Sequence, residues 1–237
     1  MIIVTGGNQK FRKIIAHSMS QCEKLGYQIE VYDLLGLGFG KKWAVNNALF
    51  QERGYYHQMS SDGWTTKAMH KPGMVEDAML THKGEFITYL DGDAVLMARI
   101  DEIVDDCDVG VTIRPDKEMK EMMNDALSHN DRDRALTQAS QINAGVLFFA
   151  GTEQSFHFVT QWRTKTVDLG NDQLAVNKLV NPNNRQLRAW ETYTIANHIR
   201  VKVFPGEIYN YTNFSSTPPG DAKIYHYKGN TWMDLIR

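Results

Sequence analysis

The sequence predicts an α/β fold with a mostly parallel sheet flanked by helices. A β-branched run at residues 2–5 is followed by apolar residues at helical spacing over 11–19 and by a second strand pattern over 28–35. Strand, helix and strand in this order form the βαβ unit that joins parallel strands. Strand and helix patterns go on alternating, with no internal repeat or low-complexity linker. We therefore expect one α/β domain over residues 1–237.

Local signals place the elements in order. The first strand is expected to stop at Gly6, Asn8 suits the N-cap of the first helix, and Gly26 ends that helix. The further elements that we expect are helices over 74–82, 100–105, 153–162 and 171–180, and strands over 86–90, 109–113, 142–150, 199–204 and 222–227. The C-terminal half is expected to contribute a smaller antiparallel portion.

Composition and charge exclude several classes of protein. Hydrophobic residues make up 42% and charged residues 23%, which excludes a disordered or collagen-like chain. The net charge of −2 gives no electrostatic basis for nucleic-acid binding. Two cysteines, Cys22 and Cys107, cannot form a disulfide framework and fit a reducing compartment. Because there is neither an apolar run of membrane-spanning length nor a signal-peptide pattern, we expect a cytoplasmic protein without an intrinsic membrane segment.

The clearest chemical signal is Asp91-Gly92-Asp93, directly after the apolar run 86–90. Carboxylates at i and i+2 of an extended chain share one face, and the glycine between them permits a bend that lets both reach one ion. Carboxylate oxygens suit Mg²⁺ or Mn²⁺, and open α/β sheets bind ligands at the carboxyl ends of their strands. The alternative is an ordinary Asp-Gly turn.

A second polar cluster, His226-Tyr227-Lys228-Gly229, lies near the C-terminus. A neutral imidazole at the end of an apolar strand can serve as a third metal ligand. Lys228 offers a cation, and Gly229 offers backbone that can approach a phosphate closely. Taken alone, His226 is better explained as a core histidine, but Asp91 and Asp93 make it a candidate ligand.

The order of these motifs resembles the metal and diphosphate signatures of GT-A glycosyltransferases, above all the retaining family 8 type and related nucleotide-diphospho-sugar transferases. The resemblance runs through Val4-Thr5-Gly6, Lys71-Pro72, Asp91-Gly92-Asp93, Arg114-Pro115, Asn143-Ala144-Gly145-Val146, Asn171-Asp172-Gln173 and His226-Tyr227-Lys228-Gly229. It implies a Rossmann-like GT-A domain with a nucleotide-binding half over residues 1–115. Residues 140–237 would form the acceptor and sugar half and carry the C-terminal metal-diphosphate motif.

The resemblance also implies a divalent metal site for Mn²⁺ or Mg²⁺, held by Asp91, Asp93 and His226. The ion would bridge the diphosphate of a nucleotide-diphosphate sugar, for which we expect a UDP-sugar. It would neutralise charge on the departing nucleotide. Lys228 and the N–H group of Gly229 would add to that stabilisation where charge develops.

The same resemblance assigns residues to the nucleotide and the sugar. The strand end Val4-Thr5-Gly6 would line the nucleoside pocket, and Gly92 would belong to the donor site beside Asp91. Lys71 would reach the donor, a role for which Lys67 competes.

The remaining implied contacts are to the transferred sugar. Asn143, Ala144 and Gly145 would place an amide at a sugar hydroxyl. Asp172 would orient donor hydroxyls, and Gln173 would lie on the face opposite the leaving group. As alternatives, Asn171 or Asp172 is equally well explained as a helix N-cap.

Glycosyl transfer passes through a transition state with oxocarbenium character. Because glutamine is a poor covalent nucleophile, we expect transfer on the same face, with retention, to a hydroxyl of a glycan, protein or small molecule. An inverting enzyme would need a carboxylate base, for which Asp172 is available. Two other functions stay open: a sugar nucleotidyltransferase, disfavoured because no arginine precedes Arg12, and a non-catalytic nucleotide- or sugar-binding module.

Overall fold

The computed structural model describes residues 1–43, 70–104, 107–115, 119–120, 124, 140–212 and 220–227. Its central feature is a sheet of eight strands in the order β3-β2-β1-β4-β7-β6-β9-β8. The strands are β1 (Ile2–Asn8), β2 (Gln28–Leu35), β3 (Lys41–Lys42), β4 (Ile87–Leu90), β6 (Val109–Ile113), β7 (Ile142–Phe149), β8 (Thr192–Thr194) and β9 (Arg200–Pro205). Both halves of the chain contribute strands to this one sheet, whereas their division into a nucleotide half and an acceptor half stays a prediction.

The strand directions confirm the expected fold class. The pairs β3–β2, β2–β1, β1–β4 and β6–β9 are parallel, and β4–β7, β7–β6 and β8–β9 are antiparallel. A separate antiparallel pair joins β5 (Ala94–Leu96) to β10 (Ile224–His226). The sheet is thus mostly parallel, with a small antiparallel unit that includes the C-terminal strand.

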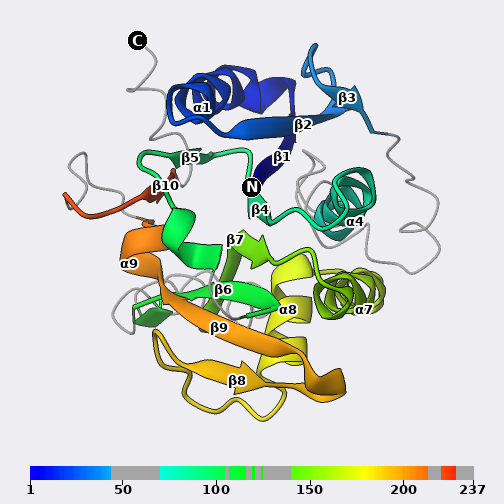
Figure 1. The fold of residues 1–237 in the computed structure, drawn as a ribbon, viewed down its shortest axis with the longest axis vertical. Helices are drawn as coiled ribbons and strands as arrows, with labels where there is room; N and C mark the ends of the chain where they lie inside the picture. The colour runs from blue at the N-terminus through cyan, green and yellow to red at the C-terminus, as the bar shows by residue number, and fades with distance from the viewer. Residues whose placement is uncertain are drawn as a thin grey trace.

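Helices cover both faces of the sheet. The helices are α1 (Arg12–Lys24), α4 (Lys71–Thr81), α7 (Glu153–Leu169), α8 (Asp172–Val180) and the short α9 (Gly206–Tyr209), with 3₁₀ turns at Gln9–Phe11, Asp101–Val104 and Ala196–His198. Buried side chains of α4, α7 and α8 form one core with the sheet, and those of α1, α9, β5 and β10 form the other. Figure 1 shows α4, α7 and α8 together on one side and β5, β10 and α9 on the opposite side. Among the described residues, no helix combines the length and the apolar character that a membrane span needs.

The expected stop of the first strand at Gly6 is wrong, because β1 continues through Asn8. A Cβ on Gly6 would lie 2.6 Å from Sδ of Met74, and one on Gly7 would lie 2.8 Å from Cδ1 of Ile15. These glycines therefore serve the close packing of helices against the strand, not a turn. Asn8 caps the 3₁₀ turn Gln9–Phe11 that leads into α1, since its Oδ1 accepts a hydrogen bond from the backbone N–H of Lys10 at 3.2 Å. The N-cap of α1 itself is Phe11, which makes no side-chain cap hydrogen bond.

Strand directions bring several chain ends to one edge of the sheet. The carboxyl ends of β1 and β4 lie there because the two strands are parallel. The start of β7 lies at the same edge because β7 is antiparallel to β4, and so does the end of β6 because it is antiparallel to β7. The first residues of α4 and α8 reach this edge as well, where Lys71 contacts both Asp91 and Asp172.

Candidate active site

Asp91, Asp93 and His226 converge at this edge, as the sequence predicts. Asp91 follows β4, Asp93 precedes β5, and β10 pairs with β5 so that His226 lies opposite Ala94. Nε2 of His226 is 3.2 Å from Oδ1 of Asp93 and 3.6 Å from Oδ2 of Asp91. One ligand atom from each of the three residues lies within 4.8 Å of the other two. Antiparallel pairing of two distant segments therefore brings the three side chains together.

Gly145 of β7 makes this convergence possible. Its carbonyl oxygen accepts a hydrogen bond from the backbone N–H of Asp91 at 2.8 Å. A Cβ at this position would lie 2.1 Å from Cε1 of His226 and 3.1 Å from Oδ2 of Asp91. Only a residue without a side chain leaves room here for the imidazole and the carboxylate together.

The three donor groups fit a hard divalent cation. Two carboxylates and one imidazole suit Mn²⁺, and the carboxylates suit Mg²⁺ as well. Nδ1 of His226 is 2.9 Å from Oδ1 of Asn210, so the other ring nitrogen faces the two aspartates. Carboxylates and an imidazole nitrogen this close favour a cation between them. Asp91, Asp93 and His226 are therefore the residues that would hold an ion.

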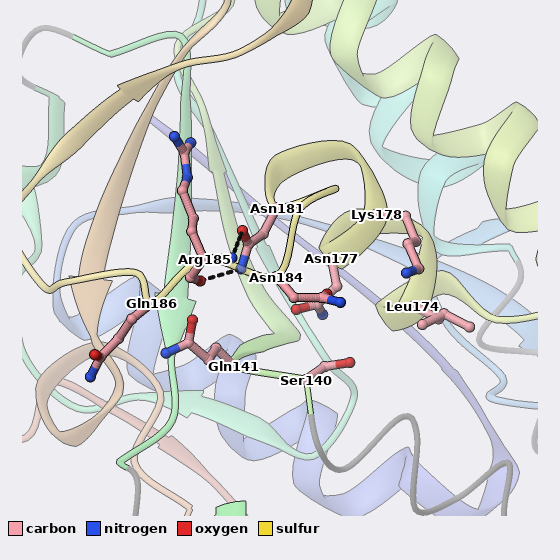
Figure 2. Close-up of a pocket in the computed structure, with 9 residues that line it drawn as sticks. All are labelled: Ser140, Gln141, Leu174, Asn177, Lys178, Asn181, Asn184, Arg185 and Gln186. Carbon is pink, nitrogen blue, oxygen red and sulfur yellow. Dashed lines mark hydrogen bonds between the residues drawn. The ribbon is translucent and has the colours of Figure 1, made fainter.

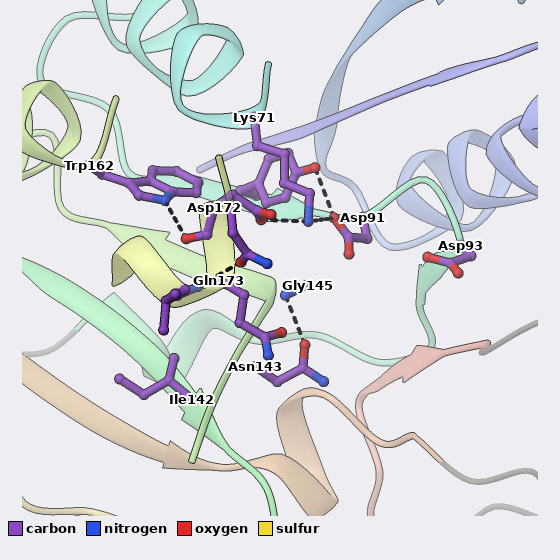
Figure 3. A network of polar contacts seen from close by, with 12 residues as sticks. Lys71, Asp91, Asp93, Ile142, Asn143, Gly145, Trp162, Asp172 and Gln173 are labelled. Carbon is purple, nitrogen blue, oxygen red and sulfur yellow. Dashed lines mark hydrogen bonds and ion pairs between the residues drawn. The ribbon is translucent and has the colours of Figure 1, made fainter. Parts of the chain in front are cut away.

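Lys71 links the metal-ligand group to α8. Its ammonium is 2.8 Å from Oδ1 of Asp91 and 2.8 Å from Oδ2 of Asp172 (Figure 3). Burial by itself lowers the pKa of Lys71, but the two carboxylates raise it above its ordinary value. Burial raises the pKa of Asp172 despite the opposing effect of Lys71. A charged lysine thus bridges two carboxylates that come from different elements.

Side chains hold the start of α8 in place through hydrogen bonds with its backbone. Oδ1 of Asn171 accepts a hydrogen bond from the N–H of Leu174 at 2.8 Å, which makes Asn171 the N-cap and leaves the Asp172 side chain available to Lys71. The indole N–H of Trp162 donates to the backbone oxygen of Asp172 at 3.0 Å. Gly170 ends α7 in the left-handed conformation, with φ 66°, immediately before this cap. The side chain of Asp172 is therefore presented toward the site.

Gln173 lies beside Asp172 and contacts a buried arginine. Nη2 of Arg114 donates to Oε1 of Gln173 at 3.2 Å, and Nη1 donates to the backbone oxygen of Ser140 at 3.1 Å. The amide of Asn177 donates to the backbone oxygen of Gln173 at 2.8 Å. The Gln173 side chain therefore has a fixed direction. In Figure 3, Gln173 borders one common space together with Asp172, Lys71, Asp91, Asn143 and Gly145.

Asn143 contributes a buried side-chain amide to the site. Its Oδ1 accepts a hydrogen bond from the N–H of Gly145 at 3.0 Å, which assigns the orientation of the amide. Its Nδ2 is buried and has no hydrogen-bond partner among the described residues. Because buried donors are normally paired, a bound hydroxyl is the natural acceptor for this group. Ala144, which the sequence places in the same site, is buried within β7.

The end of β1 meets the aspartate segment through backbone. A Cβ on Gly92 would lie 2.8 Å from the carbonyl oxygen of Gly6, so these two segments touch. The side chains of Val4 and Thr5 are buried in the sheet, which leaves the strand end as the part that can meet a ligand. A nucleoside at Val4-Thr5-Gly6 stays a prediction. Three further residues, Lys67, Lys228 and Gly229, lie outside the described residues.

Tyr89 and Asn210 contact the site, although the sequence did not indicate them as site residues. The Tyr89 hydroxyl donates to Oδ1 of Asp91 at 3.0 Å, and Asn210 orients His226. The sequence around Tyr89 is typical of a buried apolar strand. Asn210 lies between two tyrosines, and no motif surrounds it. Only the folded arrangement shows their contacts with the site.

A cavity of about 510 Å³ lies along α8, next to the site (Figure 2). Its lining is rich in side-chain amides and includes two cations, Lys178 and Arg185. The lining residues are Ser140, Gln141, Leu174, Asn177, Lys178, Asn181, Asn184, Arg185 and Gln186. Asn177 donates directly to the backbone oxygen of Gln173, and Ser140 and Gln173 both accept from Arg114. None of the sequence motifs indicated this cavity.

Comparisons with known proteins agree with this fold. The structure of a galactosyltransferase, LgtC, in complex with donor and acceptor sugar analogues matches with a TM-score of 0.54 at 15% identity, over 97% of this chain and 87% of that chain. A glycosyltransferase involved in the glycosylation of the major capsid of PBCV-1 matches with a TM-score of 0.58 at 12% identity, over 98% and 95%. Mouse xyloside xylosyltransferase 1 in its apo form gives 0.51 at 11% identity, over 98% and 99%. No curated protein matches the sequence.

A family model described as nucleotide-diphospho-sugar transferase matches residues 89–231, more than half of the 237-residue chain. The matched part contains Asp91, Asp93, Asn143, Gln173 and His226, and the fold similarity extends over the rest of the chain. The chain therefore belongs to the nucleotide-diphospho-sugar transferase family and is a glycosyltransferase with a GT-A fold.

Proposed function

We propose that this glycosyltransferase uses a UDP-sugar and a divalent metal ion, and transfers the sugar with retention to a hydroxyl acceptor. The observation that carries the proposal is the convergence of Asp91, Asp93 and His226 on one point, with Lys71, Asp172 and Gln173 beside them. The UDP donor rests on the resemblance to the retaining family 8 type.

Asp91, Asp93 and His226 would hold the ion, which would supply positive charge to the diphosphate of the donor as the nucleotide departs. Lys71 stays protonated between Asp91 and Asp172 and holds the two carboxylates in their orientation. In this position Asp172 and the unpaired amide nitrogen of Asn143 receive hydroxyls of the transferred sugar. These contacts hold the anomeric carbon in one orientation relative to the diphosphate.

Gln173 occupies the opposite side of the sugar from the leaving group. Its amide oxygen accepts from Arg114, which orients the side chain, and a neutral amide is too weakly basic to serve as a general base. A neutral amide dipole stabilises positive charge at the anomeric centre without forming a strong covalent bond. The acceptor hydroxyl then attacks from the face that the nucleotide leaves, which gives retention.

The acceptor approaches along the cavity beside α8. Its wall offers Asn184, Gln186 and the cations Lys178 and Arg185 to sugar hydroxyls, and the cavity encloses about 510 Å³. The backbone of Ser140 connects this wall to Arg114 and Gln173.

The test is hydrolysis of UDP-glucose and UDP-galactose with Mn²⁺ and with EDTA, followed by proton NMR of the released sugar. The proposal predicts Mn²⁺-dependent release of the α-anomer from an α-linked donor before mutarotation. Release of the β-anomer would contradict retention, and equal rates with EDTA would contradict the metal site.

A further inference from the structure

A line of buried polar groups leads from His226 into the central sheet. Nδ1 of His226 is 2.9 Å from Oδ1 of Asn210, and Nδ2 of Asn210 donates to Oγ1 of Thr112 at 2.7 Å. The Thr112 hydroxyl donates to the backbone oxygen of Asn143 at 3.1 Å. Asn210 is 3% exposed and Thr112 is 0% exposed, so water does not compete for these bonds.

The line ends at the backbone oxygen of Asn143, which lies at an irregularity in the pairing of β7 with β6. The pairing of β6 with β7 shifts register between Val111, which is opposite Leu147, and Thr112, which is opposite Asn143. The backbone oxygen of Asn143 is therefore available to side chains and accepts from both Thr112 and Asn210, the latter at 3.2 Å. The same bulged segment contains Gly145, which contacts His226. Bulges of this kind commonly redirect groups at active sites.

Each hydrogen bond in the line has only one possible direction. A backbone oxygen can only accept, so the amide atom of Asn210 that lies 3.2 Å from the oxygen of Asn143 must be its NH₂ group. The Thr112 oxygen accepts from the same NH₂ group, and its single hydroxyl hydrogen goes to the oxygen of Asn143, or to that of Val146 at 3.4 Å. The amide oxygen of Asn210 consequently faces His226.

This arrangement determines which nitrogen of His226 carries hydrogen. An amide oxygen can only accept, so Nδ1 of His226 must donate to it. In the neutral ring the lone pair is then on Nε2, the atom that faces Asp93 at 3.2 Å and Asp91 at 3.6 Å. A metal ligand needs this tautomer, because only a nitrogen without hydrogen can bind an ion.

We propose that Asn210 and Thr112 are positioning residues that hold His226 in the Nδ1–H tautomer and aim its Nε2 at the metal site. The inference rests on the metal site of the proposed function. Neither residue belongs to the group of side chains that would hold the ion. They act through hydrogen bonds that connect the Asn143 carbonyl oxygen to the imidazole and so set the orientation of the ring.

The test measures Mn²⁺ affinity by calorimetry without nucleotide, in the wild type and in Asn210→Leu, Thr112→Val and Thr112→Ser. Asn210→Leu removes the amide oxygen that accepts from Nδ1 of His226, and we expect Mn²⁺ binding about 10–100-fold weaker. Thr112→Val leaves the contact from Asn210 to the Asn143 oxygen, so the loss is smaller, and Thr112→Ser restores affinity. Thr166→Val, which removes a buried hydroxyl on α7, is the matched control and leaves affinity unchanged.

Nitrogen-15 NMR of histidine-labelled, metal-free protein at alkaline pH gives a readout independent of the ion. The His226 signals are assigned by their loss in His226→Gln. The proposal predicts an Nδ1–H signal for the wild type and a mixture of tautomers for Asn210→Leu. An Nε2–H tautomer in the wild type, or an unchanged tautomer and Mn²⁺ affinity in Asn210→Leu, would overturn it. If the wild type binds no Mn²⁺, the proposed metal site fails, and the tautomer in Asn210→Leu still decides whether Asn210 orients the ring.

Discussion

The imidazole of His226 lies directly against the backbone of Gly145, so that a Cβ there would be 2.1 Å from Cε1 and 2.5 Å from Nδ1. Two segments far apart in the sequence, β7 and β10, thus depend on each other at the centre of the site. The glycine also supplies the carbonyl oxygen that holds the N–H of Asp91. The position of the imidazole and that of the aspartate therefore depend on the same residue.

Gly145→Ala is expected to push His226 out of line and to weaken Mn²⁺ binding by at least about 10-fold, since even outer contacts of metal ligands have effects of this size. Calorimetric titration with Mn²⁺ measures the effect. Gly220→Ala is the matched control, because no atom of the described residues lies within 4 Å of a Cβ there. Equal Mn²⁺ affinity in Gly145→Ala and wild type would mean that His226 is not a ligand.

Asp93→Asn is expected to lower turnover by more than the roughly 10–100-fold typical of losing an outer contact, because it removes a charged ligand. The fold should stay intact, since Asp93 lies at the rim of the sheet, 3.2 Å from His226. Turnover with saturating donor and a thermal melt measure the two effects. Asp101→Asn changes an exposed carboxylate outside the site and should leave turnover unchanged. Full activity in Asp93→Asn would remove the main support for metal dependence.

Gln173→Ala is expected to impair sugar transfer more than nucleotide binding, because the proposed function assigns Gln173 to the transferred sugar and not to the diphosphate. Turnover and the Kd for UDP, measured on the same preparation, separate the two effects. Gln161→Ala on α7 removes an amide that contacts only His157 among the described partners and should change neither. An equal loss of transfer and of UDP affinity would instead place Gln173 in the nucleotide pocket.

The buried His70 is expected to lower the free energy of unfolding of the protein in acid. Burial lowers its pKa from 6.5 to about 4, and the indole N–H of Trp43 donates to its Nδ1 at 3.2 Å, which requires a neutral ring. Below pH 6.5 the unfolded chain binds a proton that the folded protein does not, so stability is full above pH 6.5 and falls toward about pH 4. The loss from this group amounts to about 3 kcal/mol.

Urea unfolding at a series of pH values measures this dependence. His70→Gln keeps an acceptor for Trp43 but cannot be protonated, so its free energy of unfolding should decline less steeply between neutral and acid pH. Parallel curves for the variant and the wild type would show that His70 does not cause the acid sensitivity.

Long buried strands and helices could be predicted from the sequence. The strands over Gln28–Leu35 and Val109–Ile113 have the expected limits, because β-branched and apolar runs end at turn residues. The helix expected over 153–162 continues to Leu169, since Gly170 is the first residue that stops it. The strands Ala94–Leu96 and Thr192–Thr194 were missed, because three residues carry no periodic signal and both strands form only through pairing with distant segments.

The site could be predicted as a set of residue types but not as a network. Asp91, Asp93 and His226 carry a local pattern, and the structure brings them together. The contact of Lys71 with both Asp91 and Asp172 depends on how α4 and α8 pack, which no local pattern encodes. Asn210 lacks a signal for the same reason, since its partners lie on β6, β7 and β10.

Binding of UDP, GDP, CDP and ADP by calorimetry, each with Mn²⁺ and again with EDTA, tests the central claim most directly. The expected result is binding of UDP that depends on Mn²⁺ and is lost in His226→Ala, with weaker binding of the other nucleotides. Binding that is the same with Mn²⁺ and with EDTA, or no binding of any of the four, would contradict a donor site built on Asp91, Asp93 and His226.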